Sequence, residues 1–302
     1  MTISLYTLPF KKLYMLDILM ISIALIALMI GSFTDLKTRE VPDWLNYGLI
    51  ISGFAIRLIY SLVVGDFTAL NYGIAGFIAF VILAYGMFYA GQWGGGDSKM
   101  IMGLGVLLGL NYRSLVNSFL LGFFINLLLV GAIYGLLWSL VLMVLNFKKF
   151  LSEFKKIISN KKLKQIKKAF LISAMLLVIF LLVIPDFLIK FFIIVLVLIS
   201  FITLYLWIFI QAIEKSCMVK PVDVEKLTEG DWIVKEVKVE GKRIAGPKDL
   251  GISKKQIQQL LNYKKQGKIR RVQIKEGIPF IPSFLIAFII TLIFGNILWL
   301  FL

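Results

Sequence analysis

Long apolar stretches alternate with short polar or basic segments along most of the chain. A helix needs about 20 apolar residues to cross a bilayer. On that measure we expect an all-α polytopic membrane protein with about eight transmembrane helices, and six to eight fit the pattern. The predicted spans are Leu16–Phe33, Leu45–Val64, Leu70–Ala90, Lys99–Leu110, Leu115–Leu145, Ala169–Ile184, Phe187–Ile210 and Ile281–Leu302. The fourth is short for a full span, and Pro185 and Asp186 predict a tight turn between the sixth and seventh.

A polar region, Glu214–Pro279, comes before the last predicted span. Trp232–Val239 and Ile269–Ile274 have the composition of strands, with Glu240 and Gly241 as a turn. Ser253 is placed to cap a helix that ends before Gly267. We therefore expect a small cytoplasmic α+β insert. The predicted organisation is a membrane domain (1–145), a basic cytoplasmic loop (146–168), a transmembrane hairpin (169–213), an α+β module (214–279) and a C-terminal helix (280–302).

Composition agrees with a membrane protein and excludes several kinds of chemistry. The 302 residues are 60% hydrophobic, with a mean hydropathy of +0.91, whereas a soluble domain is about half apolar. The first apolar run continues to Phe33, too long for a cleaved signal peptide. Histidine is absent, and Cys217 is the single cysteine, so His-based catalysis and Cys-rich zinc sites are excluded. Hydrolysis would have to use carboxylates or a Ser-Lys pair, and we expect no metal and no cofactor.

The net charge of +16 is concentrated in two segments, which predicts the topology. Asn146–Lys168 holds nine of the 33 Lys and Arg residues, and Glu214–Pro279 holds sixteen. Positive segments beside spans stay in the cytoplasm, which places the N-terminus outside. Such segments also attract anionic membrane lipids. Neither has the interleaved aromatics that stack on bases, so we expect no nucleic acid partner. Arg57, inside the second span, is expected to extend its charge towards the outer surface.

Two aspartates stand at the predicted cytoplasmic ends of spans. Asp35 ends the first span, and Asp97 follows Gly94, Gly95 and Gly96 in a Gly-x-Gly-Asp motif before the fourth. Carboxylates at the edge of hydrocarbon are costly and usually functional. Two that meet can share one proton, because close like charges separate their pKa values. The ionised one can then activate water while the other protonates a leaving amide. The glycines would let a substrate strand approach the backbone closely.

Simpler interpretations apply to several neighbouring residues. A single aspartate at a span end is most simply a boundary charge, but two with these flanking motifs favour catalysis. Asp43 is expected to cap the second helix, and Trp44 and Trp93 to be interfacial aromatics. Pro279 and Pro282 could be helix-start prolines or a rigid approach beside the active site.

The segments Asp35–Asn46 and Gly94–Lys99 resemble the type IV prepilin peptidases and archaeal preflagellin peptidases, which are Gly-x-Gly-Asp membrane aspartyl proteases. The family's two catalytic aspartates match Asp35 and Asp97. The resemblance covers about Leu16–Leu145, and Lys275–Pro282 is more loosely similar to the extra region of archaeal prepilin peptidases. It implies removal of class III signal peptides from pilin-like or archaellin precursors. The bacterial enzymes also carry a four-cysteine module and methylate their product, so one cysteine indicates the archaeal type.

Two alternatives differ in where their acids lie. Presenilin-like and signal-peptide-peptidase-like proteases cut within a spanning helix and carry Tyr-Asp at the first aspartate, where this chain has Thr34 and Asp35. A transporter or membrane scaffold would place cation-binding acids near mid-span. Both aspartates here lie at span ends, which favours the signal peptidase.

Overall fold

The computed structural model describes residues 15–116 and 118–300 of the chain. The N-terminus, which is predicted to lie outside the cell, and the last two residues of the final predicted span are not among these residues. The chain divides into two compact units, Met1–Leu137 with Gly277–Leu302, and Trp138–Glu276. The described residues form ten α-helices and five short strands, so the prediction of a mostly helical protein is confirmed.

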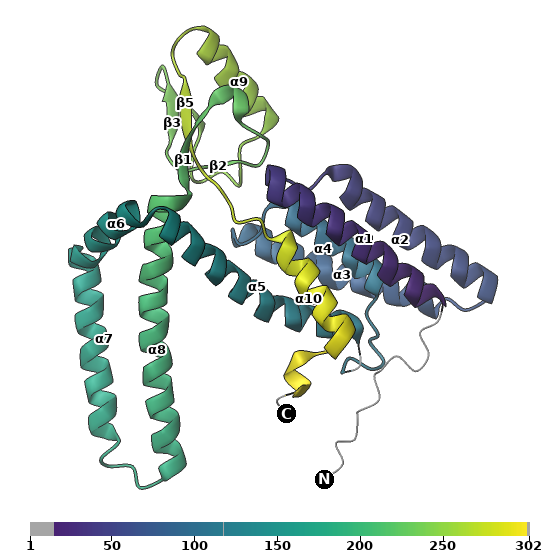
Figure 1. Ribbon diagram of the computed structural model, residues 1–302, viewed down its shortest axis with the longest axis horizontal. Helices are drawn as coiled ribbons and strands as arrows, with labels where there is room; N and C mark the ends of the chain where they lie inside the picture. The colour runs from purple at the N-terminus through teal and green to yellow at the C-terminus, as the bar shows by residue number, and fades with distance from the viewer. Residues whose placement is uncertain (1–14, 117, 301–302) are drawn as a thin grey trace. The chain divides into compact units, whose positions relative to one another are not determined.

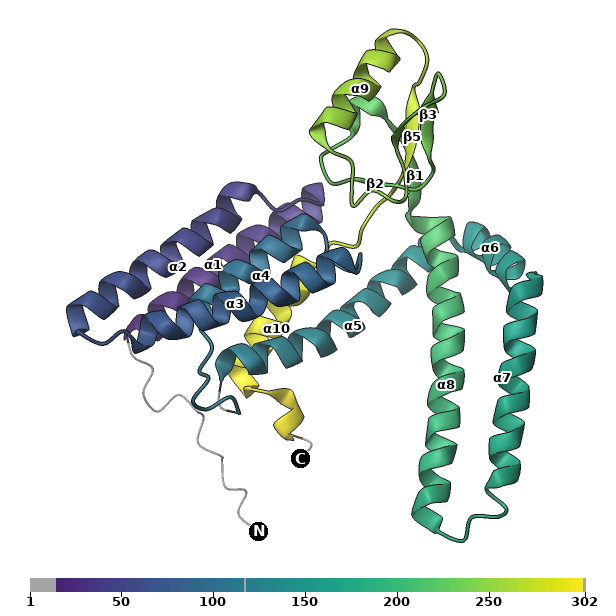
Figure 2. The same ribbon diagram turned by 180° about the vertical axis from the view of Figure 1, so that it is seen from behind.

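The first unit is a helical bundle. It contains α1 (Met15–Thr38), α2 (Asp43–Val64), α3 (Thr68–Tyr89), α4 (Gly95–Leu108), the first part of α5 (Phe119–Leu145) and α10 (Ile281–Phe294). Figures 1 and 2 show α1 to α4 side by side, with α10 packed against α1. A Cβ built on Gly76 would lie 2.2 Å from the carbonyl oxygen of Gly105. Backbone contact between α3 and α4 therefore depends on these small residues.

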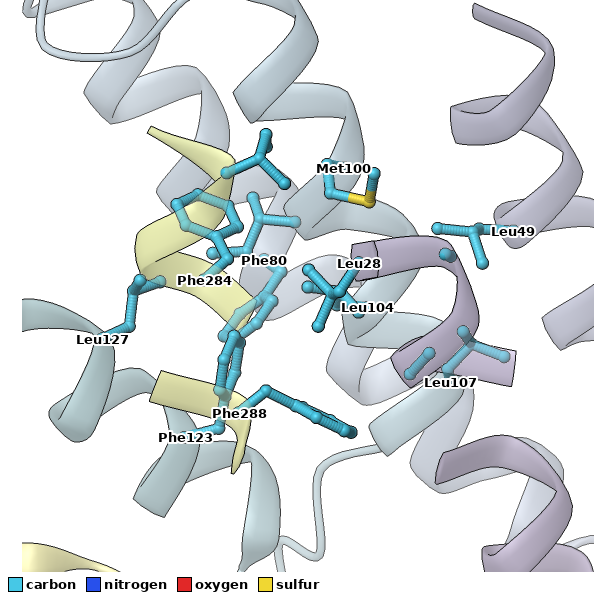
Figure 3. Packing of buried hydrophobic residues seen from close by; sticks show 14 of the residues in the cluster. Leu28, Leu49, Phe80, Met100, Leu104, Leu107, Phe123, Leu127, Phe284 and Phe288 are labelled. Carbon is cyan, nitrogen blue, oxygen red and sulfur yellow. The ribbon is translucent and has the colours of Figure 1, made fainter. Parts of the chain in front are cut away.

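The short helix α4 forms the centre of this unit. Its residues Met100, Ile101 and Leu104 are fully buried. Figure 3 shows Met100 and Leu104 among side chains of α1, α3 and α10, with Phe284 and Phe288 contributed by the C-terminal helix. Fourteen residues span only about 21 Å, and other helices surround them. Neighbouring helices therefore cover most of its length.

Five of the helical segments have the length and composition to cross a membrane. They are Met15–Thr38, Asp43–Val64, Thr68–Tyr89, Phe119–Leu145 and Phe187–Met218. The chain is therefore a multi-pass membrane protein by its helices. The predicted last span, Ile281–Leu302, was too long: α10 ends at Phe294, and Gly295 then adopts a φ of 68°. For α4, α7 and α10, crossing the membrane stays a prediction.

The second unit begins with the end of α5 and continues through α6 (Phe147–Ser159), α7 (Lys161–Phe180) and α8 (Phe187–Ile213). Figure 1 shows α7 and α8 as a hairpin, and Asp186 caps α8 by accepting a hydrogen bond from the amide of Ile189 at 3.0 Å. This confirms the predicted turn. The segment interpreted as a basic loop, 146–168, is helical apart from Asn146 and Asn160. Its apolar residues recur every three or four positions, a helical period.

A short π-helix, η1 (Glu214–Met218), connects α8 to the predicted α+β module. In the module, β5 (Arg271–Lys275) pairs antiparallel with β1 (Val219–Asp223) and β2 (Trp232–Ile233). A hairpin joins β3 (Val237–Val239) and β4 (Lys242–Ala245), and α9 (Lys254–Lys265) carries the expected Ser253 cap. The predicted mixture of strands and a helix before the last helix is confirmed, with two differences: β1 was missed, and the expected strand Trp232–Val239 is divided between two sheets.

Candidate active site

Asp35 lies in the last turn of α1 and is buried. The C-terminus of a helix is an unfavourable place for a negative charge. The start of α10 compensates the negative charge of Asp35, because Oδ2 of Asp35 accepts a hydrogen bond from the amide of Ile281 at 3.0 Å. Ile281 is the first residue of α10, where amide groups have no partner within their own helix and favour anions. The C-terminal helix thus completes the environment of an aspartate 246 residues earlier in the sequence.

Asp97 lies in the first turn of α4 and is half-buried. Its Oδ2 accepts a hydrogen bond from the amide of Gly94 at 3.1 Å, which closes the loop onto the helix start. The charge of Asp35 acts on Asp97, so the structure brings the two aspartates into electrostatic range of each other. Arg39 and Tyr134 also lie in electrostatic range of Asp35. Nothing in the sequence indicated Tyr134, because it lies in the middle of an apolar run.

The three glycines before Asp97 differ in what surrounds them. None has a positive φ, so backbone strain does not require glycine at these positions. A Cβ on Gly96 would lie 3.2 Å from Val41, which is a tight contact. A Cβ on Gly95 would meet nothing within 4 Å. Packing therefore does not require a glycine at position 95. Its lack of a side chain leaves open space next to Asp97.

Residues at the start of α2 hold the glycine loop and α4 in place. Asn46 is fully buried, and its Nδ2 lies 3.5 Å from the carbonyl oxygen of Gly96. Asp43 forms an ion pair of 2.6 Å with Lys99 on α4. The interpretation of Asp43 as a helix cap was wrong, because Pro42 occupies the cap position and no side chain caps the helix. Asp43 instead links α2 to the helix that carries Asp97.

Trp93 was wrongly interpreted as an interfacial aromatic. It is only 4% exposed, and its ring lies 6.5 Å from that of Phe280 and 5.5 Å from that of Phe284, centroid to centroid. The residue before the glycine loop is therefore packed on the start of α10. Trp44, by contrast, is exposed, and its interfacial position stays a prediction. Pro282 occupies the first turn of α10, which fits a helix-start proline.

Arg57 does not extend towards the surface as expected. It is 4% exposed, and its guanidinium donates three hydrogen bonds to backbone carbonyls: to Val106 at 2.7 Å, Leu107 at 2.8 Å and Ala69 at 2.7 Å. The first two carbonyls belong to the last turn of α4, where a cation complements the helix dipole. Arg57 thus fixes one end of α4, and Asp97 begins the other.

Two carboxylates in electrostatic range, each of which accepts a hydrogen bond from a backbone amide, can share a proton and activate water. Among the described residues, no three His, Cys, Asp or Glu side chains are grouped closely enough to bind a metal ion.

Comparison with known proteins links this region to one family. Residues 22–147 match the model of the type IV leader peptidase family. The chain is 36% identical over 87 residues to a preflagellin peptidase of Methanococcus voltae and 40% identical over 83 residues to one of Methanocaldococcus jannaschii. These alignments cover 29% and 28% of this chain and 37% and 35% of the two relatives. No solved structure matches.

Proposed function

We propose that this chain, whose residues 22–147 match the model of the type IV leader peptidase family, is a membrane aspartyl endopeptidase. The observation that carries the proposal is the pair formed by Asp35 and Asp97, each in a motif of its own, with Asp97 within reach of the charge of Asp35. In this mechanism Asp35, which accepts the amide of Ile281 and has the cation Arg39 in electrostatic range, is the ionised base that takes a proton from water. Asp97 is the protonated acid that donates to the leaving amide.

The proposed substrates are pilin-like or archaellin precursors, from which the enzyme removes a class III signal peptide. The matched relatives carry the name preflagellin peptidase, which supports this class. With one cysteine, the chain has no four-cysteine module, so we propose peptidase activity without methyltransferase activity. Residues 1–145 would form the catalytic membrane domain and 214–279 a cytoplasmic module. The transporter or scaffold alternative loses support because both aspartates lie at helix ends.

The position of the cut tests this function. Asp35 ends α1 and Asp97 begins α4, so both lie near the edge of the hydrocarbon. Unfolding a substrate helix inside lipid would expose backbone groups at a cost of several kcal/mol each. Purified enzyme incubated with a class III precursor should therefore release a product that begins at the start of its hydrophobic stretch. Mass spectrometry of that product identifies the new N-terminus.

The control for this assay is the same precursor incubated with a catalytically dead variant. A new terminus several turns into the hydrophobic helix would instead support the presenilin-like alternative. No cleavage of any class III precursor by a folded enzyme would contradict the proposed function.

The topology follows from the positive-inside rule, with the active site on the cytoplasmic face and the N-terminus outside. In a Cys217→Ser background, Asn160→Cys and Gln256→Cys should resist an impermeant thiol reagent on intact cells and react once the cells are opened. Asp66→Cys and Asp186→Cys, in exposed turns, should react from outside. Labelling of Asn160→Cys on intact cells would contradict this topology and indicate the opposite orientation.

The glycine loop is proposed to receive the substrate as an extended strand, with Gly94, Gly95 and Gly96 forming its contact surface. Gly95→Val should lower kcat/KM roughly tenfold or more, because a side chain would displace the substrate from the aspartates. The melting temperature should stay within about two degrees, since a Cβ at Gly95 meets nothing within 4 Å.

The matched control is Gly86→Val on α3, where a Cβ also has open space. It should leave both activity and melting temperature near their original values. Equal activity in Gly95→Val and the original enzyme would show that the substrate does not use this open space.

A further inference from the structure

A basic hollow lies between α6 and η1, within the unit Trp138–Glu276. Its volume is about 450 Å³. Helix α6 contributes two lysines, a serine and a glutamate, and η1 contributes a lysine and a serine. The lining residues are Lys148, Lys149, Ser152, Glu153, Lys215 and Ser216. None of them belongs to the proposed active site.

The packing of α6 holds the basic side chains towards this hollow. The four α6 residues that line it are spaced i, i+1, i+4 and i+5, which places them on one side of the helix. The other side is apolar, with Phe150 and Ile157 buried in a cluster that includes Ile208 and Ala212 of α8. The ring of Phe150 lies 5.5 Å from that of Phe209. Because this apolar contact fixes α6 on α8, the hollow is a property of the fold.

The charge inside the hollow is not balanced by protein groups. In residues 15–116 and 118–300, no ion pair is found for Lys148, Lys149 or Lys215. The one carboxylate, Glu153, is paired with Lys156 at 3.4 Å. Three ammonium groups around one hollow repel each other, and an anion between them would remove that cost. Lysine ammonium groups and a serine hydroxyl are suitable donors for phosphate oxygens.

The position of the hollow at the end of a candidate membrane span favours a lipid as the source of that phosphate. Lys215 and Ser216 lie in the last residues of the candidate span Phe187–Met218, so they are at the level where a spanning helix leaves the hydrocarbon. Exposed apolar side chains stand beside the lysines on α6, with Phe147 53% and Leu151 37% exposed. An anionic lipid could place its headgroup on the lysines and its chains along these residues.

We propose that this hollow binds the phosphate headgroup of an anionic membrane lipid at a defined site. The proposal does not depend on the peptidase activity. It differs from the general attraction of basic segments to lipid because it assigns binding to three particular lysines.

Native mass spectrometry of the detergent-solubilised full chain tests the proposal. The probes are phosphatidylglycerol, phosphatidylcholine with the same acyl chains, and inorganic phosphate. Phosphatidylglycerol should bind with a stoichiometry of one at low concentration and at least tenfold more tightly than phosphatidylcholine. The triple variant Lys148→Gln, Lys149→Gln, Lys215→Gln should lose at least tenfold in that affinity.

A second triple variant, Lys155→Gln, Lys161→Gln, Lys162→Gln, removes the same charge outside the hollow and should keep its affinity within about twofold. Circular dichroism checks that both variants are folded, and all six lysines are exposed. Equal losses in the two variants would show diffuse charge attraction and overturn the proposal. Inorganic phosphate binding as tightly as the lipid would assign the hollow to a free anion and would also overturn it.

Discussion

Asp35→Asn or Asp97→Asn should each lower the rate of precursor cleavage at least about a thousandfold. Each change removes either the base that activates water or the acid that protonates the leaving amide, and such groups contribute about 10²–10⁴-fold apiece. The asparagine at position 35 keeps an oxygen that can accept the amide of Ile281, so the bundle should stay folded. The measurement is single-turnover cleavage of a class III precursor, with melting temperature recorded in parallel.

Because the two aspartates act as one unit, the double variant should be little slower than either single variant. Asp43→Asn is the matched control, since it removes a nearby carboxylate that pairs with Lys99 at the protein surface, and it should cost less than tenfold. Near-normal activity in either single variant would refute the assignment. Activity that is lost with EDTA and restored by a divalent ion would show that the aspartates bind a metal instead.

Sequence reasoning predicted the features that depend on local pattern. The five longest apolar helices, the Asp186 turn and the Ser253 cap follow from hydrophobic run length and capping residues near in sequence. Asp35 and Asp97 could be selected because costly charges at span ends and adjacent glycines are visible in the sequence. The amphipathic helix α6 was missed because its lysines were interpreted only as topology signals.

Features that depend on contacts between distant segments could not be predicted. The amide of Ile281 reaches Asp35 across 246 positions, and Trp93 is buried against rings of the same distant helix. Arg57 looked like a surface-seeking cation because its three carbonyl partners become available only when α4 packs beside α2 and α3. A single sequence contains no signal for such pairings, since any apolar helix could occupy those places.

Arg57→Met should destabilise the membrane bundle by about 3 kcal/mol or more. Two carbonyls at the end of α4, those of Val106 and Leu107, would lose their donors inside the protein, at about 1–3 kcal/mol each. The guanidinium also fills space beside Gly73 and Gly109, so its removal leaves a gap. A melting temperature in detergent lower by roughly 10 °C is the expected result. Cleavage should fall as well, because the helix that begins at Asp97 loses its anchor at the other end.

Two further variants separate the role of Arg57 from a general effect of charge. Arg113→Met removes an exposed arginine from the same unit and should change the melting temperature by no more than about two degrees. Arg57→Lys keeps the charge, but one ammonium group cannot reach three carbonyls. The melting temperature of this variant should therefore lie between those of Arg57→Met and Arg113→Met. A melting temperature in Arg57→Met equal to that in Arg113→Met would show that these three hydrogen bonds do not hold α4. In that case the position of Asp97 would depend on the packing of α4 against its neighbouring helices and on the contacts that Asn46 and Asp43 make at the start of α2.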